Sequence, residues 1–520
     1  MPSLESRNPA TGQVLGSVTV TPARRVAALA DEVDRVARGW ALVPLAERAA
    51  LLGRAAAVIA RRRWDLSERI TAETGKTVME SSAIEVTGML LICDWLAGWA
   101  TRYLSPERVP HTKAPVWHKR HRILYRPLGT VAVIGPWNYP FSLAGSEVAF
   151  ALVAGNGVVL KPSELTPLAG EMIAEVFAEA GLPDGVLRVA QGGGDVGAAL
   201  CRAPAVRKVF FTGSTGTGRK IMQAAAKHGK PVVLEMGGKD PAIVLADADL
   251  DRAVAGVGWG AFANAGQTCA SVERVYVERP VYEEFVSRVV QHAKRLEPGD
   301  PTDPDTQVGA VTELQHARVV EHLEQAVAAG ARLECGGPVD VPGLGGRFVA
   351  PAVLTGVDHS MKVMTEETFG PVLPVMPFDR DAQALALAND SPYGLGASVW
   401  TGDPTRARAL ASGLEAGMVW VNDHAYSHPV AQTPWGGVKA SGVGVVHSKH
   451  GLYEMVDKVL LSEDRGLLPG GWWWHPYDRV KRDGFAALVD ALFARGDRVR
   501  GLPARWPALR DYLRQVFEGP

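Results

Sequence analysis

The chain has 520 residues, of which 47% are hydrophobic and 21% charged, and its formal net charge at pH 7 is −1. This length predicts two or three domains. Because the charges balance, the chain lacks the excess of basic residues that is typical of a nucleic-acid-binding protein, and a small neutral or weakly charged ligand is favoured. Four cysteines give no disulfide framework, and no signal peptide or uninterrupted apolar run of spanning length is recognised, so we expect a cytoplasmic protein.

The N-terminal part of the chain is predicted to be mostly helical. A turn at 7–12 precedes a short strand at 14–20, and Thr21-Pro22 then starts an alanine-rich helical region that reaches about Leu104. Pro44 and Gly75 break this region locally. Four apolar residues near its end recur at helical spacing and should face a core. They are Ile92, Trp95, Leu96 and Trp99.

From Gly129 onward, short apolar runs alternate with helical segments. The first set of predicted strands is 130–134, 157–160, 186–189, 209–211 and 232–234, with helices such as 167–180 and 196–201 between them. A second set begins at Pro241, with predicted strands at 242–245, 274–277, 372–376, 397–400 and 418–421. This alternation predicts two α/β domains, the first of them a doubly wound parallel sheet whose ligand binds beyond the carboxyl ends of the strands.

Two segments hold a candidate nucleophile and a candidate base. Cys269 lies among small residues in the segment 265–271, where a substrate carbonyl has room to approach its sulfur. Glu235 ends the strand 232–234 just before paired glycines and can act as a general base. The alternatives are a small buried thiol, which also suits the other three cysteines, and an exposed carboxylate at a strand end.

The segment 135–140, which follows the strand 130–134, contains Asn138. The Asn138 amide can donate to the oxygen that becomes negative when sulfur attacks a carbonyl, and the backbone N–H of Cys269 can be a second donor. One such donor is typically worth about 2.7–4 kcal/mol in the barrier. An asparagine that serves a tight turn between two prolines is the alternative.

Two further strand ends are candidates for nucleotide binding. Lys161 and Glu164 follow the strand 157–160, where the lysine can donate to a ribose hydroxyl and the carboxylate can accept from one. The segment 211–219 ends a strand and opens a helix, whose first N–H groups attract pyrophosphate. A surface charge pair and an ordinary glycine-rich turn are the alternatives, since the spacing is not G-x-G-x-x-G.

These motifs together resemble those of the aldehyde dehydrogenase superfamily, from about Arg7 to about Val459. The segments 366–371 and 434–442 also match, whereas Val445 and Val446 stand where the family usually has Arg-Glu, which puts the local packing there in doubt. The resemblance implies that Cys269 is the nucleophile, Glu235 the general base and Asn138 the oxyanion donor. It implies NAD as cofactor, with NADP as the alternative, and no metal.

The resemblance also implies a set of cofactor-binding residues. Glu367 would bind the nicotinamide ribose, Phe369 would pack near the nicotinamide, and Gly213 and Ser214 would lie near the phosphates. The whole set is Ile134, Pro136, Trp137, Lys161, Ser163, Glu164, Gly213, Ser214, Gly218, Glu367 and Phe369.

The implied fold is aldehyde dehydrogenase-like: a Rossmann-type cofactor domain, a second α/β catalytic domain and a small β oligomerisation arm. We expect the NAD-binding domain at 1–108 and 128–236, the catalytic domain at 237–440, the arm at 109–127 and 441–462, and a helical extension at 463–520. A hairpin at 117–126 and a late strand at 454–461 would form the arm. The implied assembly is a homo-oligomer, either a dimer or a tetramer.

The implied reaction is oxidation of an aldehyde to the carboxylic acid, with hydride transfer to NAD(P)+ through a cysteine thiohemiacetal and thioester. Members that pass the acyl group to coenzyme A generally lack the glutamate base, so Glu235 favours hydrolysis. Tyr139, Leu143 and Thr268 should line the substrate tunnel, and no arginine stands at those positions. Apolar aliphatic or aromatic aldehydes are therefore favoured. A semialdehyde dehydrogenase for a charged substrate and a non-catalytic scaffold anchored through the tail are the alternatives.

The segment after Glu463 lies beyond the resemblance. A break at 468–471 and three tryptophans at 472–474 precede two amphipathic helical patterns, and 505–507 is the expected start of the second helix. We favour docking of these helices on the body or on a neighbouring subunit. Contact with a membrane surface and cover over the tunnel mouth are the alternatives. The apolar stripes are Phe485, Leu488, Val489, Leu492 and Phe493, and Leu509, Tyr512, Leu513, Val516 and Phe517.

Overall fold

The computed structural model describes residues 2–111, 116–469, 471, 473–493 and 502–518. Contacts between residues divide the chain into two compact units. The larger consists of Met1–Leu104 and Arg126–Asp457, and the smaller of Ser105–Tyr125 and Lys458–Pro520. The larger unit holds both predicted α/β sheets and all of the predicted site residues.

The first sheet of the larger unit has the strand order β19-β9-β8-β5-β6-β7. All neighbours are parallel except β19, which runs antiparallel to β9. The chain builds outward from β5 to β7 and then returns to add β8 and β9 on the other side, so β5 lies at the topological switch point. The strands are β5 (Thr130–Ile134), β6 (Gly157–Lys161), β7 (Leu187–Val189), β8 (Val206–Thr212), β9 (Val232–Glu235) and β19 (Gly442–Val443). The five predicted strands are confirmed with small shifts at their ends.

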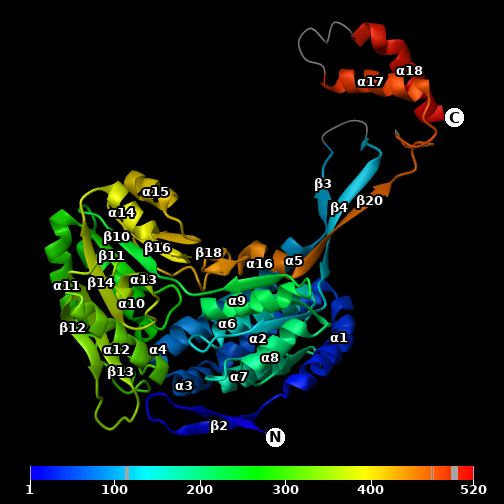
Figure 1. The fold of residues 1–520 in the computed structure, drawn as a ribbon. Helices are drawn as coiled ribbons and strands as arrows, with labels where there is room; N and C mark the ends of the chain where they lie inside the picture. Colours follow the sequence, from blue (N-terminus) through cyan, green and yellow to red (C-terminus); the bar gives the residue numbers. More distant parts are fainter. Residues whose placement is uncertain (1, 112–115, 470, 472, 494–501, 519–520) are drawn as a thin grey trace. The chain divides into compact units, whose positions relative to one another are not determined.

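Helices cover both faces of this sheet (Figure 1). One face packs against α1 (Val26–Leu42), α8 (Gly194–Arg202) and α9 (Thr215–Ala226). The other packs against α6 (Ser142–Ala154), with α2 (Leu45–Arg61), α5 (Thr87–Leu104) and α7 (Pro167–Glu179) around it. The remaining N-terminal helices are a short 3-10 turn (Ala23–Arg25), α3 (Arg63–Thr74), α4 (Val78–Glu80) and the π-helix η2 (Ser81–Val86).

The continuous helix Val78–Leu104 is long and apolar enough to cross a membrane by length and composition. Sequence analysis did not predict this. Half of the most apolar stretch of the helix is buried inside the protein. Ile92, Trp95 and Leu96 face the core as predicted. The prediction for Trp99 was wrong, because the buried row continues through Ala100, and Trp99 instead stacks on Tyr103 with 41% of its surface exposed.

The second sheet of the larger unit has the order β12-β13-β14-β11-β10-β16-β17 and is parallel except for β12. Its five predicted strands are confirmed as β10 (Asp240–Val244), β11 (Val272–Glu278), β14 (Val372–Phe378), β16 (Gly396–Trp400) and β17 (Met418–Val421). Sequence analysis missed β12 (Arg332–Val339) and β13 (Phe348–Thr355). The first contains Gly336-Gly337 and the second Pro351, residues that normally indicate a turn or an edge.

Helices also sandwich the second sheet. α10 (Leu250–Phe262) and α11 (Tyr282–Lys294) pack on one face, and α12 (Glu313–Ala328), α14 (Asp381–Asn389) and α15 (Pro404–Gly413) pack on the other. The short elements of this region are α13 (Lys362–Thr365), β15 (Tyr393–Gly394) and β18 (Val438–Lys439), with 3-10 turns η4 (Ala263–Gly266) and η5 (Arg279–Val281). The short helix α16 (Ser448–Glu454) packs on α5 and α6 beside the first sheet.

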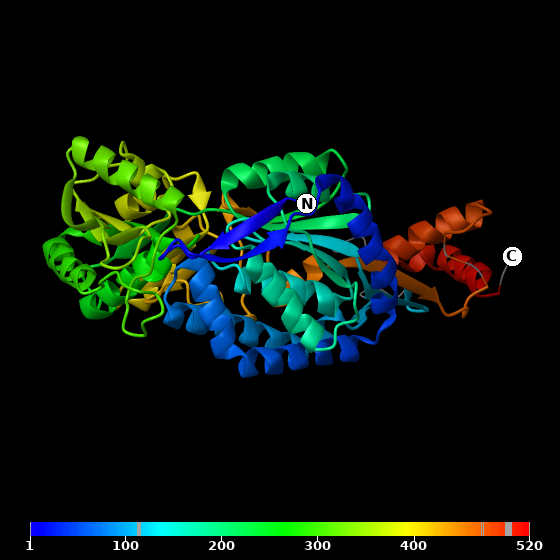
Figure 2. The same ribbon diagram turned by 90° about the horizontal axis from the view of Figure 1, so that it is seen from below.

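An N-terminal hairpin links the two halves of the larger unit (Figure 2). It consists of β1 (Ser3–Arg7), which sequence analysis did not predict, and β2 (Val14–Thr19), which it did. The carbonyl of Ala10 at its turn accepts from the N–H of Gly346, and just after β2 the N–H of Thr21 donates to the carbonyl of Gln191, both at 2.8 Å. These bonds tie the hairpin to both α/β regions.

The smaller unit contains a three-stranded sheet of order β20-β4-β3, made of β3 (Glu107–Val109), β4 (Lys119–Pro127) and β20 (Val456–Asp464). Its two helices, α17 (Arg479–Phe493) and α18 (Leu502–Glu518), bury Tyr512 and Val516 between them. A side chain at Gly484 would lie 2.0 Å from Tyr512, so glycine permits this close crossing. α18 begins at Leu502, before the predicted start at 505–507. Trp472 lies outside the described residues.

Candidate active site

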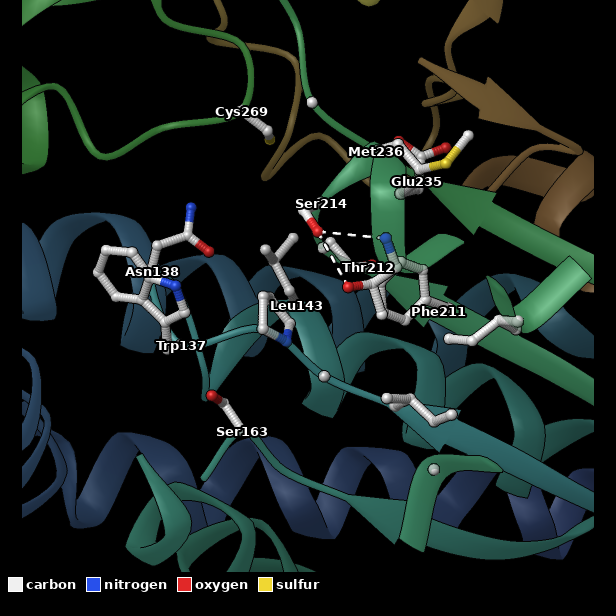
Figure 3. Close-up of a pocket in the computed structure, with 18 of the residues that line it drawn as sticks. Trp137, Asn138, Leu143, Ser163, Phe211, Thr212, Ser214, Glu235, Met236 and Cys269 are labelled. Atoms are coloured by element: carbon white, nitrogen blue, oxygen red, sulfur yellow. Dashed lines mark hydrogen bonds between the residues drawn. The ribbon is translucent and has the colours of Figure 1, made fainter. Parts of the chain in front are cut away.

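A cavity of about 620 Å³ opens at the carboxyl ends of β5, β6, β8 and β9 in the larger unit (Figure 3). The predicted residues that line it are Ile134, Pro136, Trp137, Asn138, Lys161, Ser163, Glu164, Gly213, Ser214, Glu235, Cys269, Glu367 and Phe369. Gly218 does not line it. A side chain at Gly218 would lie 2.3 Å from the sulfur of Met236, so this glycine allows α9 to pack closely on the segment after β9.

Cys269 is presented by a sharply turned loop between α10 and β11. Asn264, Ala265 and Gly266 have φ angles of 54°, 53° and 71°, in the left-handed region. This conformation is unfavourable for residues other than glycine by roughly 1–2 kcal/mol each. At Gly266 any side chain would meet the backbone of Gly370 at 2.2 Å. In Figure 3 the Cys269 side chain lies across the cavity from Trp137 and Asn138.

Asn138 is buried opposite the sulfur, and its Nδ2 donates to the carbonyl of Gln267 at 3.0 Å. An amide nitrogen has two N–H groups, and this bond uses one of them. A buried ion pair that sequence analysis missed fixes the segment, since Lys76 Nζ lies 2.5 Å from both the Asn138 carbonyl and Glu85. Glu85 also accepts from the N–H of Phe141 at 2.9 Å. The sequence carries no local signal for this pair, since Glu73 and Glu80 stand in the same segment.

Glu235 is 5% exposed, and its Oε1 has no hydrogen-bond partner among the described residues. Burial raises the pKa of Glu235 well above its usual range, and the nearby carboxyl of Glu147 raises it further, while a hydrogen bond from the Trp435 indole opposes the shift. Burial also raises the pKa of the Cys269 thiol, with Glu235 as the next cause. Burial in this site thus disfavours the charged form of both groups.

The part of the cavity expected to bind the nucleotide has a glycine backbone without a side chain and one ion pair. Lys161 Nζ lies 3.4 Å from a Glu164 carboxylate oxygen, and Glu164 is half exposed. Ser214 caps the start of α9. A side chain at Gly213 would meet the Phe211 ring at 2.6 Å, so the backbone there stays open to a ligand. A capped helix start, an exposed glycine backbone and a lysine–carboxylate pair together fit the phosphates and ribose of a dinucleotide.

Glu367 and Phe369 close the cavity from the catalytic region. A Glu367 carboxylate oxygen accepts from the N–H of Gly238 at 3.1 Å, and burial, followed by Glu273, raises its pKa to about 8. The Phe369 ring meets Trp137 edge to face at 5.6 Å between centroids. Glu273, which sequence analysis also missed, accepts from the N–H groups of Thr368 and Phe369 at 2.7 and 2.8 Å and so fixes this segment.

A second cavity, of about 470 Å³, meets the first at Cys269, Leu143, His428 and Trp435. Its lining is mainly apolar and aromatic, and none of its lining residues in the described chain is arginine or lysine. The predicted tunnel residues Tyr139, Leu143 and Thr268 all line it. Its further lining residues are Met79, Glu80, Ala83, Ile84, Trp259, Gly260, Ala263, Ala270, Ala425, Tyr426 and Pro429.

The comparisons with known proteins agree with this arrangement. Residues 2–459 match the Aldehyde dehydrogenase family. 4,4'-Diapolycopene aldehyde oxidase of Methylomonas sp. is 39% identical over 495 residues, which are 95% of this chain and 92% of that protein. Betaine aldehyde dehydrogenase of Mesorhizobium japonicum is 40% identical over 443 residues, 84% of this chain and 88% of that protein.

Solved structures share the fold. Betaine aldehyde dehydrogenase from Staphylococcus aureus in complex with NAD+ has a TM-score of 0.85 and 32% identity, covering 91% of this chain and 94% of that one. The chain therefore belongs to the aldehyde dehydrogenase family. It is an oxidoreductase that uses NAD(P), and the predicted fold class, with a Rossmann-type cofactor region and a second α/β region, is confirmed.

Proposed function

We propose that the protein oxidises apolar aldehydes to carboxylic acids, with Cys269 as nucleophile, Asn138 as oxyanion donor and Glu235 as general base. The observation that carries this proposal is the position of Cys269, which lines both the dinucleotide-sized cavity and the apolar one. An aldehyde that enters through the apolar cavity and a nicotinamide that enters through the other would meet at its sulfur.

The chemistry follows from the groups present. The Cys269 sulfur forms a bond to the aldehyde carbon as its proton passes to Glu235, and the Asn138 amide and the Cys269 N–H stabilise the oxyanion. A bound dinucleotide would supply the hydride acceptor for this carbon, and Cys269 would then hold the acyl group as a thioester. Glu235 returns the thiol proton to solvent and then takes one from water, whose oxygen adds to the thioester carbon. The carbon–sulfur bond breaks, and the proton of the released acid passes to the Cys269 thiolate.

The substrate class rests on the lining of the second cavity. A carboxylate-bearing semialdehyde would need a cationic partner there, whereas Ile84, Trp259 and Pro429 offer apolar contact. The relative named 4,4'-diapolycopene aldehyde oxidase supports a long apolar aldehyde, and its 95% coverage of this chain means that the similarity extends beyond residue 463.

We propose NAD as the preferred cofactor, because the Glu164 carboxylate beside Lys161 would repel a 2′-phosphate. We further propose a cytoplasmic homo-oligomer, a dimer or tetramer, in which the arm at 109–127 and 441–462 mediates assembly. Four free thiols support a reducing compartment. The proposed domains are the NAD-binding domain at 1–108 and 128–236, the catalytic domain at 237–440 and the helical extension at 463–520.

The test is the absorbance of reduced nicotinamide during incubation with a panel of aldehydes and either NAD or NADP. We expect turnover with apolar aldehydes of increasing chain length and little with carboxylate-bearing semialdehydes. Cys269→Ser should abolish turnover, because a neutral hydroxyl is a far weaker nucleophile. Turnover confined to charged semialdehydes, or a fully active Cys269→Ser variant, would contradict the proposal.

A further inference from the structure

A second buried carboxyl shares the cavity with Glu235. Glu147 is the one charged residue of α6, a helix that is buried on nearly every side. Its side chain lines the first cavity, and the residue is only 7% exposed. Placing an ionisable group in such an apolar helix is unfavourable, and neither the hydride transfer nor the nucleophilic attack uses it.

The two carboxyls act on each other electrostatically. Burial raises the pKa of Glu147 to about 8, with Lys208 opposing the shift and Glu454 adding to it. Glu147 is in turn the second cause, after burial, of the raised pKa of Glu235. Two carboxyls in one poorly solvated cavity resist carrying two negative charges, which favours a proton on one of them.

The two residues that act electrostatically on Glu147, Lys208 and Glu454, form an ion pair with each other. Lys208 on β8 donates to the backbone carbonyl of Glu454 at 2.9 Å and also pairs with its carboxylate. The Glu454 side chain, at the end of α16, is 34% exposed, whereas that of Lys208 is 8% exposed. Glu147 thus shares the closed cavity with Glu235 and interacts electrostatically with Glu454, whose side chain reaches solvent.

Two other titratable groups border the same cavity. His428 and His447 both line it, and their rings lie 5.1 Å apart. Burial lowers the pKa of both imidazoles, that of His428 to about 4. Both histidines are therefore neutral at pH 7, and the carboxyls of Glu147 and Glu454 are the better carriers for a proton that leaves Glu235.

We propose that Glu147 is the proton-transfer residue through which Glu235 returns its proton to solvent, by way of Glu454. This inference rests on the proposed function, in which Glu235 receives a proton from the thiol and another from water in each turnover. Each time, Glu147 releases its proton outward to the Glu454 carboxylate, which passes it to water. The proton on Glu235 then moves to Glu147 through water in the cavity, and Glu235 is again a carboxylate.

The test compares Glu147→Gln with the wild type in the full-length protein, with Glu179→Gln as the matched control. Glu179 is a surface carboxylate of α7 with a 41% exposed side chain. In Glu147→Gln, we expect the first turnover of reduced nicotinamide to be retained, the steady-state rate to fall about tenfold or more, and acyl-enzyme to accumulate. Glu147→Asp should restore part of the rate, and Glu454→Gln should have a smaller effect. The control should match the wild type.

A second readout needs no turnover. Infrared absorption of protonated buried carboxyls, followed through a pH titration, should show one carboxyl fewer in Glu147→Gln and a lower titration midpoint for Glu235. Unchanged steady-state rate and an unchanged Glu235 midpoint would overturn the inference. Equal loss of the first turnover and of thermal stability would assign Glu147 a structural role and overturn it too. If the wild type oxidises no aldehyde, the proposed function fails, and the infrared titration still decides whether the two carboxyls share a proton.

Discussion

The two cavities that meet at Cys269 are built in different ways. The cofactor cavity lies at the carboxyl ends of parallel strands, where backbone N–H groups, glycines and a few charged side chains gather. The apolar cavity is lined by η2, α10 and the loop around Tyr426, which are far apart in the sequence. The first is largely a product of local strand-to-helix connections, and the second exists only because distant elements pack together. Selectivity for the aldehyde should therefore change without loss of the cofactor site.

Among changes that leave the nucleophile in place, the largest effect is expected in the cofactor cavity, at the oxyanion donor. Asn138→Ala should lower kcat about 10²–10³-fold, because the developing negative oxygen loses a preorganised donor. NAD affinity, measured by fluorescence quenching or calorimetry, should stay unchanged. A variant that loses NAD binding in proportion to kcat would instead show that Asn138 serves the turn before α6.

The pH dependence of kcat/KM should report the raised pKa of Glu235, which is buried in the cofactor cavity. The pKa of Glu235 is raised above the ordinary carboxyl value, and a base acts only after it has lost its proton. The value of kcat/KM should therefore rise with pH through the neutral range into the alkaline range. A pH–rate profile from about pH 6 to about pH 10 checks this. A profile that is flat above about pH 5 would mean that Glu235 has an unperturbed pKa or is not the base.

On the apolar side, Ile84→Arg should lower kcat/KM for long apolar aldehydes about 10–200-fold, because it replaces apolar contact with a charge that must be desolvated. The rate with a short aldehyde, which needs less of the cavity, should fall less. Val36→Arg is a matched control, since Val36 on α1 is exposed and lines neither cavity. Equal losses for short and long aldehydes would place Ile84 outside the substrate path.

The smallest kinetic effect is expected from a change in the C-terminal segment. No described residue of 463–518 lines either of them, so deletion of 463–520 should leave kcat and KM for a water-soluble aldehyde unchanged. Light scattering and thermal unfolding of the truncated protein test whether the tail docks on a subunit. Loss of the oligomer or of stability would support docking. Unchanged assembly, stability and kinetics would leave membrane contact as the role, and altered kinetics would favour cover over the tunnel.

Sequence alone determined the alternation of strands and helices and the segments that end each strand, because apolar periodicity and glycine-rich connections are local properties. It also singled out Cys269, Glu235 and Asn138 as candidates. Sequence analysis missed β12 and β13, because their glycines and proline are typical of turns. It placed Trp99 in the core, because helical spacing cannot show where a neighbouring helix ends.

Tertiary structure alone decided which charged groups are buried together. The pairs Lys76–Glu85 and Lys239–Glu273 and the shared cavity of Glu147 and Glu235 join residues from separate elements. No local pattern marks them, because the desolvation that shifts a pKa depends on the whole set of elements packed around a side chain. The same holds for the apolar cavity, whose lining residues are ordinary core-forming residues until the folded chain leaves a space between them.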